Sequence, residues 1–119
     1  MNNIIEELVN RGIGRSNFTT YEALMDAMEG YEASELEVIG ACEVFASFME
    51  REFGYDKEGI RTDLLYFKSE NNFVPICIDT ILVNNVYTSG LYIARGRVAV
   101  KLGNDDDDEN VAYLWLDNN

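Results

Sequence analysis

The side chains of this sequence that could do chemistry are mostly carboxylates. Aspartate and glutamate together number 22, whereas histidine is absent. Without histidine the chain lacks the commonest general base and metal ligand, and it cannot build a Ser-His or Cys-His nucleophile system. Two well-placed acids suffice for glycoside hydrolysis, but no such pair is identified by counting acids. The phosphate-binding patterns G-x-x-x-x-G-K-[ST] and G-x-G-x-x-G do not occur either. We therefore expect no catalytic site and no cofactor.

The densest acidic run lies in the segment GNDDDDEN, residues 103–110. It does not fit the calcium-binding loop of EF-hands: with Asp105 as the first position, the sixth is Asn110 instead of glycine and the twelfth is Leu116 instead of glutamate. The run is interpreted as a solvated loop that resists edge-to-edge strand pairing, or as a contact for a basic partner. Weak binding of divalent ions is a third alternative for its five acids, Asp105, Asp106, Asp107, Asp108 and Glu109.

A second group of acids is spread over EALMDAMEGYEASELE, residues 22–37, which holds six carboxylates and no Lys or Arg. Glu22, Asp26 and Glu29 are spaced i, i+4 and i+7. On a helix this spacing puts them within about 40° of one line, with the second and third roughly 6 and 10 Å along it from the first. Like charges at such spacing repel by a few tenths of a kcal/mol, and only Glu22, in the first turn, gains from the helix dipole.

The absence of basic residues extends from Ser16 through Glu50, a segment with eight acids and no Lys or Arg. Solvated helices usually mix both signs, because Glu–Lys pairs one turn apart stabilise them. Carboxylates held several ångströms apart on rigid helices imitate a line of phosphates, so a basic channel that binds nucleic acid would attract them. Together with the run at 105–109, the predicted partner-binding residues are Glu22, Asp26, Glu29, Glu32, Glu35, Glu43 and Glu50.

The whole chain is acidic, with 22 acids against nine bases and a net charge of −13. This charge repels phosphate backbones and anionic lipids, which argues against direct binding to nucleic acid or membrane. The alternative is that the excess charge only keeps a small protein in solution. No apolar stretch reaches the roughly eighteen residues of a membrane span, and the N-terminal MNNIIEELVNRG does not resemble a signal peptide. With Cys42 and Cys77 expected as reduced thiols, we predict a cytoplasmic protein.

The elements that must position these acids fall into a helical and a strand-rich half. Apolar residues at helical spacing predict helices over 4–10, from about 20 to 29, and over 35–53. Thr19-x-x-Glu22 and Ser34-x-x-Glu37 are read as capping boxes that open the second and third helices, and Gly30 and Gly54 as their terminators. The third helix has a predicted core stripe of Val38, Ala41, Phe45, Phe48 and Met49.

After Gly59, β-branched and aromatic residues predict strands over 60–67, 73–83, 91–102 and 111–116. The segment LYIARGRVAVKL, 91–102, is read as one half-buried strand. Alternation puts its bases Arg95, Arg97 and Lys101 on one face, where they would neutralise acids of the same molecule, and its apolar residues on the other: Tyr92, Ala94, Val98, Val100 and Leu102. The predicted fold is a single α+β domain over 1–119, with about three N-terminal helices (1–59) followed by an antiparallel sheet of about four strands (60–119).

Small size, acidity, the lack of histidine, the carboxylates at 22–50 and the run at 105–109 resemble, at the level of composition, the small phage-encoded inhibitors of bacterial defence: anti-CRISPR proteins and DNA-mimicking anti-restriction proteins. The resemblance implies a non-enzymatic protein without cofactor that occludes the nucleic-acid site of a basic effector or nuclease. One alternative is an acidic chaperone or immunity-type protein that masks a basic or toxic partner, and another is a structural domain whose charge has no role in binding. An apolar contact on the strand half is left open for Tyr87, Tyr92, Tyr113 and Trp115.

Overall fold

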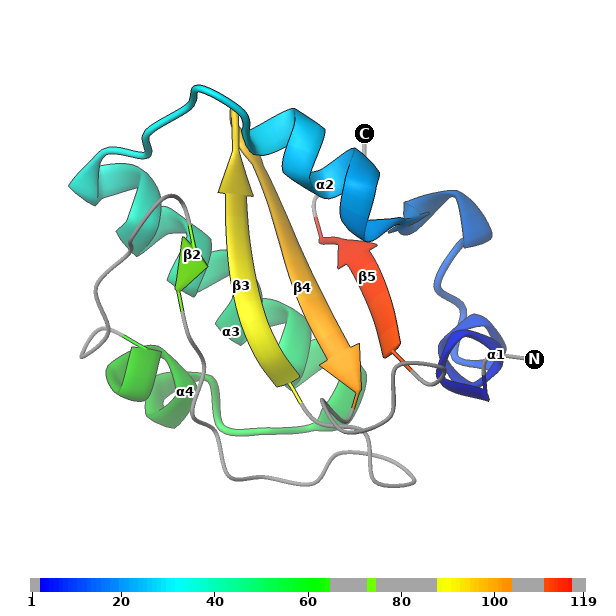
Figure 1. Cartoon of the computed structure of the whole chain (residues 1–119). Helices are drawn as coiled ribbons and strands as arrows, with labels where there is room; N and C mark the ends of the chain where they lie inside the picture. The colour runs from blue at the N-terminus through cyan, green and yellow to red at the C-terminus, as the bar shows by residue number, and fades with distance from the viewer. Residues whose placement is uncertain (1–2, 65–72, 75–87, 104–110, 117–119) are drawn as a thin grey trace.

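The computed structural model describes residues 3–64, 73–74, 88–103 and 111–116. In chain order these residues form α1 (Asn3–Asn10), the short 3-10 helix η1 (Arg15–Asn17), β1 (Phe18–Thr19), α2 (Tyr21–Met28), α3 (Glu35–Phe53), α4 (Lys57–Leu64), β2 (Phe73–Val74), β3 (Thr88–Ala94), β4 (Arg97–Gly103) and β5 (Val111–Trp115). The predicted α+β class, with N-terminal helices and an antiparallel sheet, is confirmed (Figure 1). The acidic run at 105–109, Cys77 and Tyr87 lie outside the described residues.

The sheet is an antiparallel meander of β2, β3, β4 and β5, to which β1 adds an edge strand. β1 pairs antiparallel with β5, with Phe18 opposite Leu114, so the strand order is β1-β5-β4-β3-β2. The strand predicted at 111–116 is confirmed as β5. Of the strand predicted at 73–83, the structure describes only Phe73–Val74, which do form a strand.

The segment 91–102 is a hairpin, and the single strand predicted from its alternation is wrong. Ala94 lies opposite Arg97, and Arg95 and Gly96 form the turn between them with φ of 41° and 80°. Positive φ at both central residues gives a two-residue turn whose twist matches that of the flanking strands. Asn-Gly and Asp-Gly are the usual signals for such a turn, and the less typical Arg-Gly is flanked by residues that continue the strand pattern on both sides.

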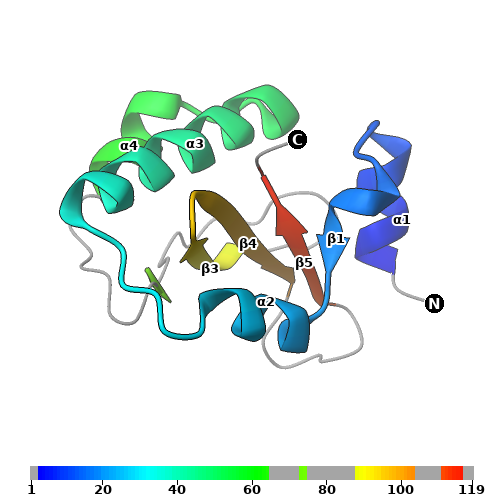
Figure 2. The same cartoon turned by 90° about the horizontal axis from the view of Figure 1, so that it is seen from above.

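Helices cover both faces of the sheet (Figure 2). α3 packs on one face, in a core cluster that also includes α1 and the sheet residues Leu91, Ile93, Val98, Val100, Leu102 and Leu114. α2 packs on the opposite face, over Tyr92, Ala94, Ala99 and Trp115. A sheet covered on both faces needs apolar residues at consecutive positions, which is why Leu91–Ala94 and Val98–Val100 are buried throughout. The predicted common apolar face of 91–102 is therefore wrong, because its members divide between two cores.

Side-chain caps define where the two central helices begin. The box predicted at Ser34 is confirmed: its Oγ accepts a hydrogen bond from the Glu37 amide at 3.2 Å, and the Glu37 carboxylate accepts one from the Ser34 amide at 3.1 Å. The box predicted at Thr19 is wrong by one residue. Thr20 caps α2 by accepting from the Ala23 amide at 3.1 Å, because Thr19 is held in β1 opposite Tyr113.

The predicted core stripe of α3 is confirmed. Ala41, Phe45, Phe48 and Met49 are buried, and Val38 packs partly buried against the same cluster. Cys42 lies beside them as a free, buried thiol, and this burial raises its pKa. Because the thiolate is the reactive form, Cys42 is a structural residue of the core.

The strand predicted from residue 60 is also wrong, since residues 57–64 form α4. Asp56 precedes this helix, and aspartate is a favoured N-cap residue. Its carbonyl accepts the first-turn hydrogen bond from the Ile60 amide at 3.1 Å. Ile60 is buried in the core cluster of α3, so one apolar residue anchors a short helix whose other side is polar. Residues 65–67 of the predicted strand lie outside the described residues.

Candidate functional site

Five of the predicted partner-binding acids form one exposed stretch of chain, which we call the acidic band: Glu22, Asp26, Glu29, Glu32 and Glu35. Glu22 and Asp26 lie on α2, whose opposite side buries Leu24 completely against the sheet. Glu29 and Glu32 follow in the linker between α2 and α3, and Glu35 is the first residue of α3. Burial of the apolar side of α2 therefore turns its acids toward solvent.

The acidic band passes around one end of the sheet. α2 and α3 lie on opposite faces, and the linker that joins them crosses from one face to the other (Figures 1 and 2). The carboxylates are consequently displayed in succession along the outer side of α2, over the end of the sheet, and at the start of α3. A partner that follows the band would contact one end of the molecule.

Contacts from the β3–β4 turn hold the linker in place. The guanidinium of Arg95 donates through Nη2 to the Glu29 carbonyl at 3.0 Å and lies 5.5 Å from the centre of the Tyr31 ring. The Tyr31 hydroxyl donates in turn to the Glu37 carboxylate, which is also part of the α3 capping box. Arg95 thus positions the backbone of the band by contacting a carbonyl and a ring.

The carboxylates of the acidic band are not neutralised by neighbours that the structure describes. In residues 3–64, 73–74, 88–103 and 111–116, the ion pairs involve Glu6, Glu43, Glu52 and Glu58, and none includes a member of the band. Unpaired carboxylates on an ordered surface keep their full attraction for an external cation.

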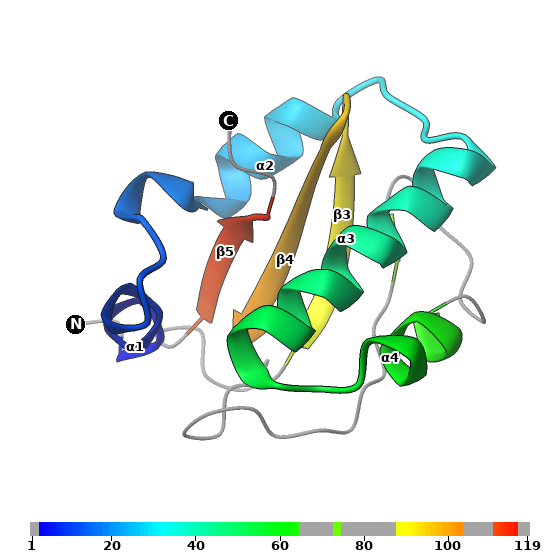
Figure 3. The same cartoon turned by 180° about the vertical axis from the view of Figure 1, so that it is seen from behind.

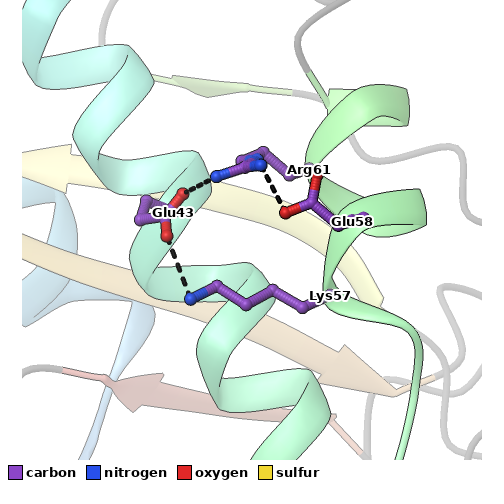
Figure 4. Close-up of polar contacts among 4 residues, drawn as sticks. All are labelled: Glu43, Lys57, Glu58 and Arg61. Atoms are coloured by element: carbon purple, nitrogen blue, oxygen red, sulfur yellow. Dashed lines mark hydrogen bonds and ion pairs between the residues drawn. The ribbon is translucent and has the colours of Figure 1, made fainter.

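Glu43, another predicted partner-binding residue, instead forms ion pairs with basic residues of the same molecule (Figure 4). Its two carboxylate oxygens contact Lys57 Nζ at 3.0 Å and Arg61 Nη1 at 2.9 Å, and Arg61 also pairs with Glu58. Hydrogen bonds from Arg61 and then Lys57 lower the pKa of Glu43. Sequence reasoning missed this network because it placed Arg61 on a strand, whereas the helical spacing of Lys57 and Arg61 directs both toward α3.

The remaining predicted residues are separated from the band. Glu50 is exposed near the C-terminal end of α3, on the other side of the sheet from α2. Of the aromatic residues considered for an apolar contact, Tyr92 and Trp115 are buried under α2 at 7% exposure each. They therefore belong to the core. The guanidinium of Arg97 lies 3.9 Å from the centre of the Trp115 ring.

A pocket of about 230 Å³ lies between the segment 12–17, the C-terminal part of α3 and the end of β5. Its charged groups satisfy one another: Arg51 Nε contacts the Glu52 carboxylate at 3.0 Å. The Arg11 guanidinium donates to the Glu52 carbonyl at 2.8 Å, and the side-chain amide Nδ2 of Asn17 donates to the Trp115 carbonyl at 3.4 Å. With these groups already paired, the pocket offers little for recognition of a ligand.

Comparison with known proteins gives no match: no protein-family model, curated protein or solved structure is similar to this chain. In the part of the chain that the structure describes, no three acidic or cysteine side chains are grouped so that they would hold a metal ion. None of the described helices combines the length and the apolar character needed to cross a membrane.

Proposed function

We propose that this protein is a non-enzymatic binding protein that occludes the nucleic-acid site of a basic effector or nuclease. The observation that supports the proposal is the acidic band, with five exposed carboxylates that form no ion pair within the described residues. On α2, Glu22 and Asp26 follow one another at about 6 Å along the helix axis. A single DNA strand carries one phosphate per about 3.4 Å of axis, so the two linear charge densities are of the same order.

The net charge of −13 would bring the protein to a basic channel, and the acidic band would orient it there. Exposed ion pairs contribute about 0.2–1 kcal/mol each, so five of them give roughly 1–5 kcal/mol. A nanomolar complex needs about 12 kcal/mol. The band therefore supplies attraction and orientation, and a tight complex requires an additional apolar contact.

The alternative function is an acidic chaperone or immunity-type protein that masks a basic or toxic partner. Three large apolar side chains of α3, Leu36, Ile39 and Val44, are exposed, and an apolar contact through them would hold a basic partner whether or not its nucleic-acid site is covered. For either function we propose that the protein acts in the cytoplasm. The free, buried thiol of Cys42 supports this location, because thiols stay reduced in that compartment.

Competition with nucleic acid distinguishes the two functions. The protein is used to capture partners from bacterial lysate at low salt, and each identified partner is purified and mixed with a labelled oligonucleotide. A mimic displaces the oligonucleotide, and its affinity falls steeply as salt rises from 0.05 to 0.3 M, over which screening shortens the range of its charges. Simultaneous binding of oligonucleotide and protein would refute the proposal and favour masking.

The matched variant for this assay is the triple charge reversal Glu22→Lys, Asp26→Lys and Glu29→Lys. All three side chains are exposed, so we expect the variant to keep the circular dichroism spectrum and unfolding cooperativity of the parent while losing displacement. Glu58→Lys serves as a control outside the band, since Glu58 lies on α4 and contacts Arg61. Equal displacement by the triple variant and the parent would show that the band is only a solvated surface.

A further inference from the structure

The side of α3 that faces away from the sheet carries an exposed apolar surface, which we call the outer face of α3: Leu36, Ile39, Gly40 and Val44. Leu36, Ile39 and Val44 are 80%, 44% and 37% exposed. At about 100° per residue these three positions span about 140° of the helix circumference, on the side opposite the core stripe. Figure 3 views the molecule from this side, with α3 crossing in front of the sheet and α4 beside it. Large exposed apolar patches typically mark interaction sites, so three large exposed apolar side chains on one side of one helix are a candidate for such a site.

Gly40 lies in the middle of this face, one turn from both Leu36 and Val44. Apart from its chain neighbours and the backbone of its own helix, a Cβ atom built on Gly40 meets no atom within 4 Å, so packing inside the molecule does not require a glycine. Glycine in a helix interior is less stable than alanine by about 1 kcal/mol. Its lack of a side chain leaves a depression between two apolar side chains, and such a depression lets the backbone of another helix approach closely.

The charges around the outer face decide which occupant it suits. Glu35 lies at its N-terminal end, and Glu43 and Glu50 follow Leu36 at intervals of seven residues, on nearly the same line of the helix. Glu43 is neutralised by Lys57 and Arg61. Arg51, beside Glu50, is paired with Glu52, so the acids that form no ion pair with a described residue, Glu35 and Glu50, are at the two ends. In a two-fold dimer of α3 helices, parallel or antiparallel, acidic ends would meet acidic ends. A second copy of a chain with a net charge of −13 is therefore a poor occupant.

We propose that the outer face of α3 is a docking site for an amphipathic helix of a basic protein. Apolar residues of that helix cover Leu36, Ile39 and Val44 and approach most closely at Gly40. Lysine or arginine residues near its ends lie opposite Glu35 and Glu50. The proposal rests on the proposed function in taking a basic partner, and it supplies the apolar contact that the acidic band lacks.

The probe for this site is a fluorescein-labelled helical peptide of about 14 residues that contains only leucine and lysine. In one version leucines recur every three or four positions and form a stripe, and in the other the same residues are scrambled around the helix. Fluorescence anisotropy at 0.15 M salt measures both affinities. We expect the striped peptide to bind about tenfold more tightly, a ratio that burial of one leucine side chain accounts for.

Two variants test whether the outer face of α3 produces that preference. Leu36→Ser combined with Ile39→Ser should reduce the ratio to about one. Gly40→Gln should also reduce the ratio, because the glutamine side chain fills the depression. This variant should stay folded, since glutamine forms helix better than glycine does, so a lower ratio would not be caused by unfolding. The reversal of Glu22, Asp26 and Glu29 should weaken both peptides and leave their ratio unchanged, so failure of this proposal is distinguishable from failure of the proposed function.

Three results of the peptide assay would overturn the docking site. The parent protein binds both peptides equally, or the serine variant retains the preference, or Gly40→Gln binds the striped peptide as tightly as the parent does. Sedimentation of the parent as a dimer that Leu36→Ser dissociates would also overturn it, and would assign the face to a second copy of the chain.

Discussion

Replacing Gly40 with alanine should stabilise this protein, although most substitutions destabilise the proteins in which they are made. The residue lies inside α3, with helix on both sides and open space around the position that a Cβ atom would take. Alanine therefore gains helix propensity without steric conflict. The expected gain in the free energy of unfolding is about 1 kcal/mol. For a chain of 119 residues, with an unfolding entropy of about 2.1 cal/mol/K per residue, this corresponds to a rise in Tm of about 4 °C.

The same chemical change at Gly54 is the matched control. Gly54 ends α3 with φ of 74°, a left-handed conformation that costs a residue with a Cβ atom roughly 1–2 kcal/mol. Gly54→Ala should therefore lower the free energy of unfolding, opposite in sign to Gly40→Ala. Urea denaturation followed by circular dichroism measures both, with equal m-values as the check that only stability changed.

Destabilisation by Gly40→Ala would refute the reasoning, because it would mean that the glycine serves the fold of the isolated molecule. A gain in stability accompanied by weaker binding of the striped leucine–lysine peptide would instead show that the glycine is kept for the contact.

Three further predictions concern the cap, the core and the ion-pair network. Ser34→Ala should lower the free energy of unfolding by about 1 kcal/mol through loss of the capping box, measured in urea; no change there would show that the box is unimportant. Phe45→Ala, which empties a fully buried site, should cost about 3–5 kcal/mol, and a loss below 1 kcal/mol in the same assay would contradict the described core. Because Lys57 and Arg61 lower the pKa of Glu43 in the folded state, its stabilising effect is complete above the unfolded pKa and disappears as pH falls through the folded one. Glu43→Gln should therefore flatten the acid limb of a plot of stability against pH, and an unchanged limb would refute the coupling.

Local signals in the sequence were sufficient for α3. Ser34 and Glu37 act on the start of the helix and Gly54 on its end, each through hydrogen bonds or backbone angles of nearby residues, so these signals can be recognised without tertiary structure. The Arg95–Gly96 turn could not be recognised in the same way. Arginine is an unusual residue for a left-handed turn position. Both flanking strands are covered on two faces, so their apolar and polar residues do not alternate in a way that would show where one strand ends and the next begins.

The candidate site was predicted in part for a similar reason. The exposure of Glu22 and Asp26 follows from the apolar side of their own helix, which the sequence displays. Glu43 is separated from these acids because α2 and α3 cover opposite faces of the sheet, and it is neutralised by Lys57 and Arg61 of α4. Both facts depend on tertiary structure. Leu36, Ile39 and Val44 carried a signal in their spacing on α3, outside the core stripe, but sequence alone does not show which of two apolar sides a helix buries.

The pairing of β1 with β5 has a consequence for the order in which the molecule assembles. Phe18 and Leu114 lie opposite each other in the sheet although they are far apart in the chain, and contacts of such separation are slow to form. α2 follows β1 directly and packs on Trp115 of β5. During synthesis, the helix that carries Glu22 and Asp26 therefore has no complete surface to pack on until β5 has left the ribosome. A nascent chain lacking residues 111–116 should not yet present the acidic band in its final geometry.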